Sequence, residues 1–351
     1  MEEIWWGKVP NAVAFISDIV YSLLSEKSVI LTCSGEFPWH TYMISTITEA
    51  VKQKNGSKQF EYADNIQDPG AYLLQEFCKP EKRAEYRPTK SYARFFAESD
   101  DIVLHERFHW VKVYSKEQLN AWMNLISEYV KARAKNRESA AFILEWISNK
   151  PVQAKKGIKI YSLDEYISGY DKIVFCTLAS SSVKEKTYLK NYLTELSASV
   201  VENDIELCAE CMADYRRFLL DPYLSISRIT QEKLRSDGNN YSFTKTKDDV
   251  NHAIWLAQIR TIFPLLEEYR ERFVRKYKSV IEKQLPITSS NGERYDDPRD
   301  VELGTLKYMA DNRLISFQQK DYECLNRYRN ARNKLSHLTP LTLEEIEHLK
   351  A

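Results

Sequence analysis

The chain has 351 residues, of which 28% are charged, 43% hydrophobic and 12% aromatic. This length accommodates two or three domains with their own cores, and the composition excludes a chain that is disordered throughout. The 50 basic and 50 acidic side chains give a formal net charge of zero, so a nucleic acid could be contacted only through a local basic patch. The nine glycines argue against a large β-rich architecture.

The first half of the chain alternates between segments typical of strands and segments typical of helices. Short β-branched or apolar runs predict strands, several of them buried, at residues 28–33, 102–113, 140–147 and 172–178. Apolar side chains spaced by threes and fours predict helices at residues 41–54 and 118–134. Because this alternation implies right-handed crossovers, residues 1–180 are predicted to form an α/β domain whose parallel sheet is covered on both faces.

The second half of the chain is predicted to be helical. Residues 181–250 are expected to form a helical connector, and residues 251–351 an all-α helical bundle. Cys208 and Cys211 lie three residues apart on a predicted helix, which favours a place on its buried stripe over metal binding. We expect no metal ion and no cofactor.

The predicted bundle begins with a long amphipathic helix at residues 251–284, which Pro264 should kink or divide. A polar loop at 288–300 and a short helix at 301–309 follow. The next helix begins near Phe317, and Thr342-x-x-Glu345 predicts a capping box that opens the last helix.

Targeting signals are not visible in the sequence. Residues 1–6 lack the basic start and apolar run of a signal peptide. No apolar segment reaches about 18 residues, the length that a membrane span requires. We therefore expect a cytoplasmic protein with no membrane contact.

Residues 34–41, Ser-Gly-Glu-Phe-Pro-Trp-His-Thr, follow the first predicted strand and have the place and length of a phosphate-binding P-loop, G-x-x-x-x-G-K-[ST]. His40 stands where the P-loop has lysine, and Ser34 and Trp39 replace its two glycines. Without those glycines the backbone amides cannot wrap around phosphates. The apolar run that ends at Glu145 is similar to a Walker B strand. The first domain thus resembles a P-loop ATPase core that has lost nucleotide hydrolysis, although another doubly wound α/β domain would fit as well.

Residues 105–109 have the sequence H-E-x-x-H, which binds zinc in peptidases when a helix sets both histidines on one face. The flanking residues predict a strand instead. In an extended strand the two imidazoles would lie about 13 Å apart, too far for one metal ion. A zinc peptidase is therefore the least favoured of the functions considered for this sequence.

The most informative stretch lies near the C-terminus and has the sequence Arg327-Tyr328-Arg329-Asn330-Ala331-Arg332-Asn333-Lys334-Leu335-Ser336-His337. It places four cations within eight residues, with no acid among them, and then a histidine. Histidine can move a proton near neutral pH, and arginine can hold a phosphate and stabilise charge as it builds. These are the groups that cleavage of a phosphodiester requires.

Residues 332–337 have the form Arg-Asn-x-x-x-His, which resembles the signature of the HEPN superfamily, small helical domains many of which are metal-independent ribonucleases. The resemblance covers residues from about 255 to 351. It implies that His337 is the general base or acid, Arg332 the phosphate binder and Asn333 a positioning group. It also implies attack of an RNA 2′-hydroxyl on the adjacent phosphate, which leaves a cyclic phosphate and a 5′-hydroxyl.

The other cations of the stretch, Arg327, Arg329 and Lys334, are expected to contact RNA, with Tyr328 as a weaker candidate. Arg332 and His337 are five residues apart, or about 140° around an ideal helix, so one helix does not aim both at the same atom. The two side chains could still act on one phosphate if the helix loosens near Pro340. They could also do so if the motifs of two chains meet across a two-fold axis. The second arrangement is usual in the HEPN superfamily, so the resemblance implies a homodimer through the C-terminal domain.

The resemblance predicts an endoribonuclease, a hydrolase of antiviral defence or of a toxin-like stress response, in which the first domain senses a trigger or docks a regulatory or defence-complex protein. The runner-up is a non-catalytic interaction subunit whose HEPN domain only mediates assembly. A solvated basic helix end is the plainest alternative, because arginine and lysine favour the last helical turn, where they complement the helix dipole.

Overall fold

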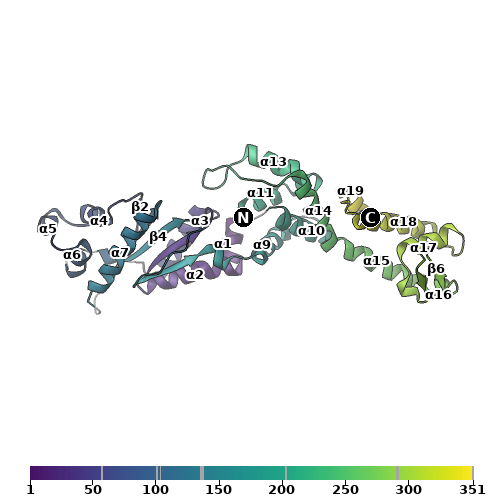
Figure 1. The fold of residues 1–351 in the computed structure, drawn as a ribbon, viewed down its shortest axis with the longest axis horizontal. Helices are drawn as coiled ribbons and strands as arrows, with labels where there is room; N and C mark the ends of the chain where they lie inside the picture. The colour runs from purple at the N-terminus through teal and green to yellow at the C-terminus, as the bar shows by residue number, and fades with distance from the viewer. Residues whose placement is uncertain are drawn as a thin grey trace. The chain divides into compact units, whose positions relative to one another are not determined.

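The computed structural model describes residues 1–56, 58–99, 102, 104–134, 138–201, 204–289 and 292–349 (Figure 1). The chain divides into two compact units, Met1–Phe175 and Cys176–Ala351. The second unit contains both the predicted connector and the predicted C-terminal domain. Within the described ranges, no helix combines the length and the apolar character that crossing a membrane requires.

The first unit is built on a five-stranded sheet in which every pairing is parallel. Its order is β2-β3-β4-β1-β5. The strands are β1 (Ser28–Cys33), β2 (Gln59–Asp64), β3 (Arg107–Val113), β4 (Ala141–Ile147) and β5 (Ile158–Ser162). All six residues of β1 are buried, as a central strand covered on both faces requires. The predicted parallel sheet of an α/β domain is confirmed.

Helices cover both faces of this sheet (Figure 1). The helices of the first unit are α1 (Glu2–Lys8), α2 (Pro10–Leu24), α3 (His40–Lys54), α4 (Pro69–Phe77), α5 (Pro80–Glu85), α6 (Tyr92–Glu98), α7 (Lys116–Ala132) and α8 (Leu163–Tyr166). The boundary between the two units falls within the next helix, α9 (Gly169–Ser181). On one face, Trp122 of α7 packs on Phe142 of β4 with ring centroids 5.8 Å apart, and both side chains are fully buried. On the other face, α2 packs on α3 and on β1.

Two predicted strands are wrong in whole or in part. Residues 172–178 belong to helix α9. The buried residues Phe175, Cys176 and Ala179 have helical spacing, while Val174 is 36% exposed, so the short apolar run covers one side of a helix. In the segment 102–113 the strand begins only at Arg107 and follows a 3-10 turn, Leu104–Glu106.

The second unit consists of helices and one small hairpin. The helices are α10 (Thr187–Val200), α11 (Ile205–Ala213), α12 (Tyr215–Leu220), α13 (Pro222–Glu232), α14 (Lys247–Thr261), α15 (Phe263–Lys276), α16 (Lys278–Glu282), α17 (Leu303–Asp311), α18 (Gln319–Ser336) and α19 (Leu343–Leu349). The predicted long helix is interrupted where Pro264 opens α15. Part of the predicted polar loop forms the antiparallel hairpin β6 (Ile287–Thr288) and β7 (Arg294–Tyr295). Cys208 and Cys211 are fully buried on α11, as predicted.

The H-E-x-x-H sequence lies on the 3-10 turn and on β3, not on an α-helix. His109 points into the core, where its ring stacks on Phe142 and meets Phe77 edge-on, with centroids 5.0 and 4.8 Å away. Burial lowers the pKa of His109 from 6.5 to about 4, although a hydrogen bond with the carbonyl of Leu104 opposes the shift. His109 is therefore a neutral residue of the core.

The buried His109 makes the stability of the protein depend on pH. Between pH 6.5 and about 4 the unfolded chain binds a proton at this position that the folded chain does not, so stability is lost as the pH falls. We expect His109 to contribute a loss of roughly 3 kcal/mol between pH 7 and pH 4. Urea unfolding across this range should show a shallower pH dependence for His109→Gln than for the wild type. Identical slopes would contradict a neutral, buried imidazole.

Candidate functional site

The motif helix α18 is held along its length by α14 and α15, which run antiparallel to it. The indole Nε1 of Trp255 donates to the carbonyl of Leu335 over 2.7 Å. The rings of Tyr269 and Tyr328 stack with centroids 3.7 Å apart. Near the start of α18, Asp321 accepts a hydrogen bond from Lys276 over 2.6 Å. These contacts fix the rotation of α18 about its axis, and with it the direction of each motif side chain.

The last helix, α19, supports the C-terminal half of α18. The hydroxyl of Tyr328 donates to the carbonyl of Leu349. The capping box that the sequence predicts is present, since Glu345 accepts from the Thr342 amide and the Thr342 hydroxyl accepts from the Glu345 amide, over 2.9 and 3.2 Å. Glu345 also forms an ion pair with Lys334, with Nζ and Oε1 2.5 Å apart.

Arg332 faces α17, and its guanidinium pairs with Glu302 at a distance of 2.8 Å. It lines a pocket of about 450 Å³ together with Glu267, Arg270, Glu293, Arg294, Tyr295, Arg299, Asp300 and Glu302. Arginines and carboxylates are equally numerous in this lining, so the pocket has no excess of positive charge. Glu302 was not predicted from the sequence. It precedes Arg332 by thirty residues, and no local pattern links the two positions.

His337 is the residue at which α18 ends. Its backbone amide donates to the carbonyl of Asn333 over 3.1 Å, and its side chain is exposed. Asn333 is half-buried. His337 does not line the pocket that contains Arg332. A single chain therefore presents the motif imidazole and the motif guanidinium in different directions, as the five-residue spacing predicts.

The remaining predicted RNA contacts divide into exposed and buried groups. Arg327 is exposed, and its guanidinium donates to the sulfur of Cys324 over 3.1 Å. Arg329 donates to the side chain of Asn330 over 3.4 Å. Both of these hydrogen bonds go to uncharged groups, so neither bond compensates the charge of its guanidinium. Tyr328 is only 5% exposed, and burial raises the pKa of its phenol. Its position indicates a role in holding α18 in place.

A second polar cluster lies at the carboxyl edge of the sheet in the first unit, where open α/β sheets bind ligands. Trp39 precedes α3 with a left-handed backbone, φ +43°, and His40 follows it. The His40 Nε2 lies 2.8 Å from the Glu145 carboxylate, which also accepts from the Trp110 indole over 3.1 Å. The structure thus joins the residue in the place of the P-loop lysine to the residue at the end of the Walker B-like strand.

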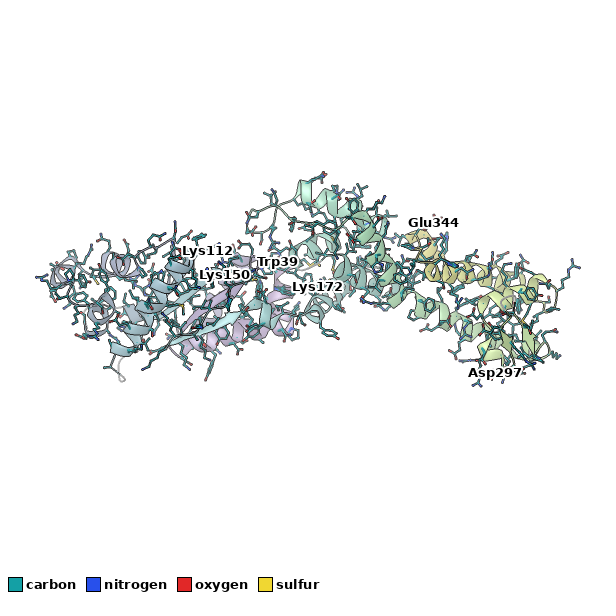
Figure 2. All side chains as sticks on the ribbon, in the orientation of Figure 1. Trp39, Lys112, Lys150, Lys172, Asp297 and Glu344 are labelled. Carbon is teal, nitrogen blue, oxygen red and sulfur yellow. The ribbon has the colours of Figure 1, made fainter. Side chains whose placement is uncertain are left out.

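Glu145 is 1% exposed, and its charge depends on its neighbours. Burial on its own raises the pKa of Glu145, but the hydrogen bond and charge of His40, the Trp110 hydrogen bond and the Lys112 charge outweigh it and leave the pKa below its usual value. Lys112, labelled in Figure 2, has its Nζ 4.0 Å from the second carboxylate oxygen. Neighbouring side chains of the same chain therefore stabilise the negative charge of the buried Glu145 carboxylate.

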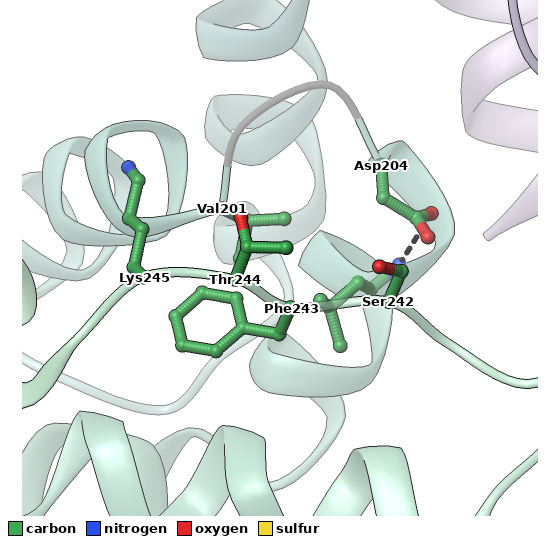
Figure 3. A pocket seen from close by; sticks show the side chains of 7 residues that line it. Val201, Asp204, Ser242, Phe243, Thr244 and Lys245 are labelled. Carbon is green, nitrogen blue, oxygen red and sulfur yellow. Dashed lines mark hydrogen bonds between the residues drawn. The ribbon is translucent and has the colours of Figure 1, made fainter.

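A further pocket, of about 240 Å³, is formed by α10, α11 and the segment before α14 (Figure 3). The carboxylate of Asp204 is turned back to the start of α11, where it accepts from the Leu207 amide over 3.1 Å. The Nζ of Lys245 donates to the carbonyl of Ser199 over 3.0 Å. Both charged groups are thus used within the fold, and neither was selected from the sequence.

No protein-family model matches this sequence, and no curated protein matches it. Across the described part of the chain, no group of three or more histidine, cysteine, aspartate or glutamate side chains is arranged to hold a metal ion.

The Glu145 cluster predicts a specific cost of mutation. In Glu145→Gln the His40 and Lys112 side chains lose the buried carboxylate that compensates them, so the free energy of unfolding should fall by about 3 kcal/mol. The exposed Glu117 on α7 provides a matched control, and Glu117→Gln should change stability by no more than about 0.5 kcal/mol. Urea unfolding at pH 7 measures both. A loss below about 1 kcal/mol in Glu145→Gln would contradict the ion pair.

Proposed function

We propose that this protein is a metal-independent endoribonuclease of the HEPN type. The observation that carries the proposal is the placement of Arg332, Asn333 and His337 at the C-terminal end of α18, with α14 and α15 packed antiparallel against the motif helix. A long helical segment before the motif helix is the context that the HEPN resemblance requires. The exposed His337 and the two unneutralised arginines, Arg327 and Arg329, are the features that an RNA strand would meet.

The reaction uses proton transfer and charge stabilisation alone. The neutral imidazole of His337 takes the proton of a ribose 2′-hydroxyl, whose oxygen attacks the adjacent phosphorus. The guanidinium of Arg332 stabilises the charge that builds on the phosphate oxygens. The bond to the 5′-oxygen breaks, and that oxygen takes up a proton from an imidazolium. The products are a 2′,3′-cyclic phosphate and a 5′-hydroxyl.

The site requires two chains. Arg332 and His337 diverge on one helix, so a phosphate held by Arg332 is approached by the partner subunit's His337 across a two-fold axis. The Arg332–Glu302 ion pair does not block this arrangement. Glu302 is 44% exposed, and exposed ion pairs contribute only about 0–1 kcal/mol, so a phosphate can replace the carboxylate.

We propose that the first unit is a P-loop-like module that does not hydrolyse nucleotides. Its support is the succession of β1, loop and α3 in a parallel sheet, together with His40 at the position of the P-loop lysine. That side chain is bound to Glu145, so it is not free to bind phosphate. By analogy of fold alone, this module senses a trigger or docks a regulatory protein in an antiviral or toxin-like system.

One observation favours a second function, a non-catalytic HEPN subunit that mediates assembly. Two of the motif cations, Arg332 and Lys334, pair with carboxylates of the same chain. A domain that only assembles would keep such pairs permanently. RNA turnover in the absence of metal separates the two functions.

Variants of the motif test the nuclease. His337→Ala and Arg332→Ala should each lower the rate of RNA cleavage in EDTA by at least about 100-fold, because each removes a group that acts only on the reacting phosphodiester. Thermal unfolding should be nearly unchanged, since His337 is exposed and Arg332 forms only a surface ion pair. Gel analysis of total RNA and a phosphatase assay for cyclic phosphate ends provide the measurement.

His348→Ala is the matched control, because His348 is exposed on α19 and lies outside the motif. It should cleave RNA at the wild-type rate. Full activity in both motif variants, or cleavage products with 3′-hydroxyl ends, would exclude this mechanism.

A further inference from the structure

A groove in the first unit runs along α7 beneath the loop that joins β4 to β5, and we call it the α7 groove. It consists of two pockets, of about 460 and 540 Å³, that share Lys155. The lining of the first includes Lys116, Asn120, Pro151, Val152, Gln153 and Lys155. The second is lined by Asn124, Ser127, Glu128, Lys131, Lys155 and Lys156. Lysines therefore occur at both ends of the groove and at its centre.

The loop that covers the groove is fixed in position. Gly157 ends it with a φ of +84°, and a Cβ at this glycine would lie 2.9 Å from the side chain of Val130 on α7. Only glycine permits this close approach. Two residues earlier, the Nζ of Lys155 donates to the side chain of Asn124 on α7. Gly157 and Lys155 thus both hold the loop against α7.

The charge of the groove is strongly positive in a chain with no net charge. The loop at residues 148–157 contains three lysines and no acid. Lys116 and Lys131 are exposed on the facing side of α7. Among the described residues that line the groove, Glu128 is the one acid. It accepts from the Ser91 hydroxyl over 2.7 Å and lies 3.6 Å from Arg94. A local basic surface of this kind is the electrostatic footprint of a polyanion site.

We propose that the α7 groove binds the backbone of single-stranded RNA, the substrate class of the function proposed above, on which this inference rests. Lys116 and Lys131 are separated by about 22 Å along the helix, which suits the shorter sites of about four nucleotides found on single-strand binders. Lysine ammonium groups bind phosphates as point charges and suit a backbone of variable sequence. The groove thus holds an RNA strand on a unit that carries none of the motif residues.

The walls of the groove fit a nucleotide chain in a second way. Asn120 and Gln153 offer amide donors and acceptors to sugar and phosphate oxygens. Apolar surface that can contact the faces of bases comes from Pro151, which is exposed, and from the half-buried Val152, both on the loop. The groove therefore combines lysines on α7 and on the loop with a small apolar surface on the loop, a combination that suits a single strand bound without reading its sequence.

The test uses the full-length chain with the His337→Ala substitution, which prevents cleavage during binding. A fluorescein-labelled oligouridylate of about 12 nucleotides is titrated and its anisotropy is followed at several salt concentrations. Lys155→Gln with Lys156→Gln should weaken binding about tenfold at about 0.1 M salt, and should lower the slope of log affinity against log salt by about 1.4. Lys116→Gln with Lys131→Gln should have the same effect, without touching the loop.

The matched control is Lys52→Gln with Lys54→Gln, which removes the same charge from the exposed end of α3. It should leave affinity and salt slope nearly unchanged. Equal losses in the groove and control variants, or no loss in the groove variants, would overturn the proposal. Binding of labelled oligoglutamate but not of RNA would also overturn the proposal, because it would identify an acidic peptide as the ligand of the groove.

Failure of this inference and failure of the nuclease can be distinguished. If the wild type does not cleave RNA in EDTA but binds it through the groove lysines, the nuclease is wrong and the RNA-binding groove stands. If the wild type cleaves RNA and the groove variants bind it normally, the groove proposal is wrong and the nuclease stands.

Discussion

The five-residue separation of Arg332 and His337 on one helix is the constraint on which the functional account depends. A helix turns by about 100° per residue, so the two side chains leave α18 about 140° apart. Contacts along α18 prevent the helix from rotating to compensate, above all the stacked Tyr269 and Tyr328 and the Trp255 bond to the end of the helix. Because the helix is held in this way, we propose that a second chain completes the catalytic site.

Both places where the sequence points to phosphate are occupied by carboxylates of the chain itself, but the two pairs differ in burial. Glu145 is 1% exposed, so its bond to His40 would be costly to break and is a permanent part of the sheet edge. Glu302 is 44% exposed, and its pair with Arg332 can exchange with a phosphate at little cost. Burial therefore distinguishes the pair that would be costly to open, His40 with Glu145, from the pair that a phosphate could open, Arg332 with Glu302. The α7 groove differs from both places, because four of its lining residues are lysines and one, Glu128, is an acid.

The parallel sheet, the motif helix, the break at Pro264 and the capping box at Thr342 could all be predicted, since each depends on local patterns of apolar, helix-breaking or capping residues. The strand predicted at residues 172–178 was wrong because a short apolar run fits a strand and the buried side of a helix equally well. The partners of the motif cations could not be predicted. Glu302 meets Arg332 only because α17 packs antiparallel against α18, and the bond between His40 and Glu145 joins residues 105 positions apart.

Mixing two inactive variants tests most directly whether the site is shared between chains. Arg332→Ala and His337→Ala chains are denatured together, refolded and assayed for RNA cleavage in EDTA. In a mixed dimer, one site loses both groups and the other retains both, and mixed dimers form half of a random population. A site shared between two chains predicts recovery of about a quarter of the wild-type rate, from one intact site in half of the dimers. Activity no greater than the sum of the separate variants, in mixtures shown to contain mixed dimers, would contradict a catalytic site built from two chains.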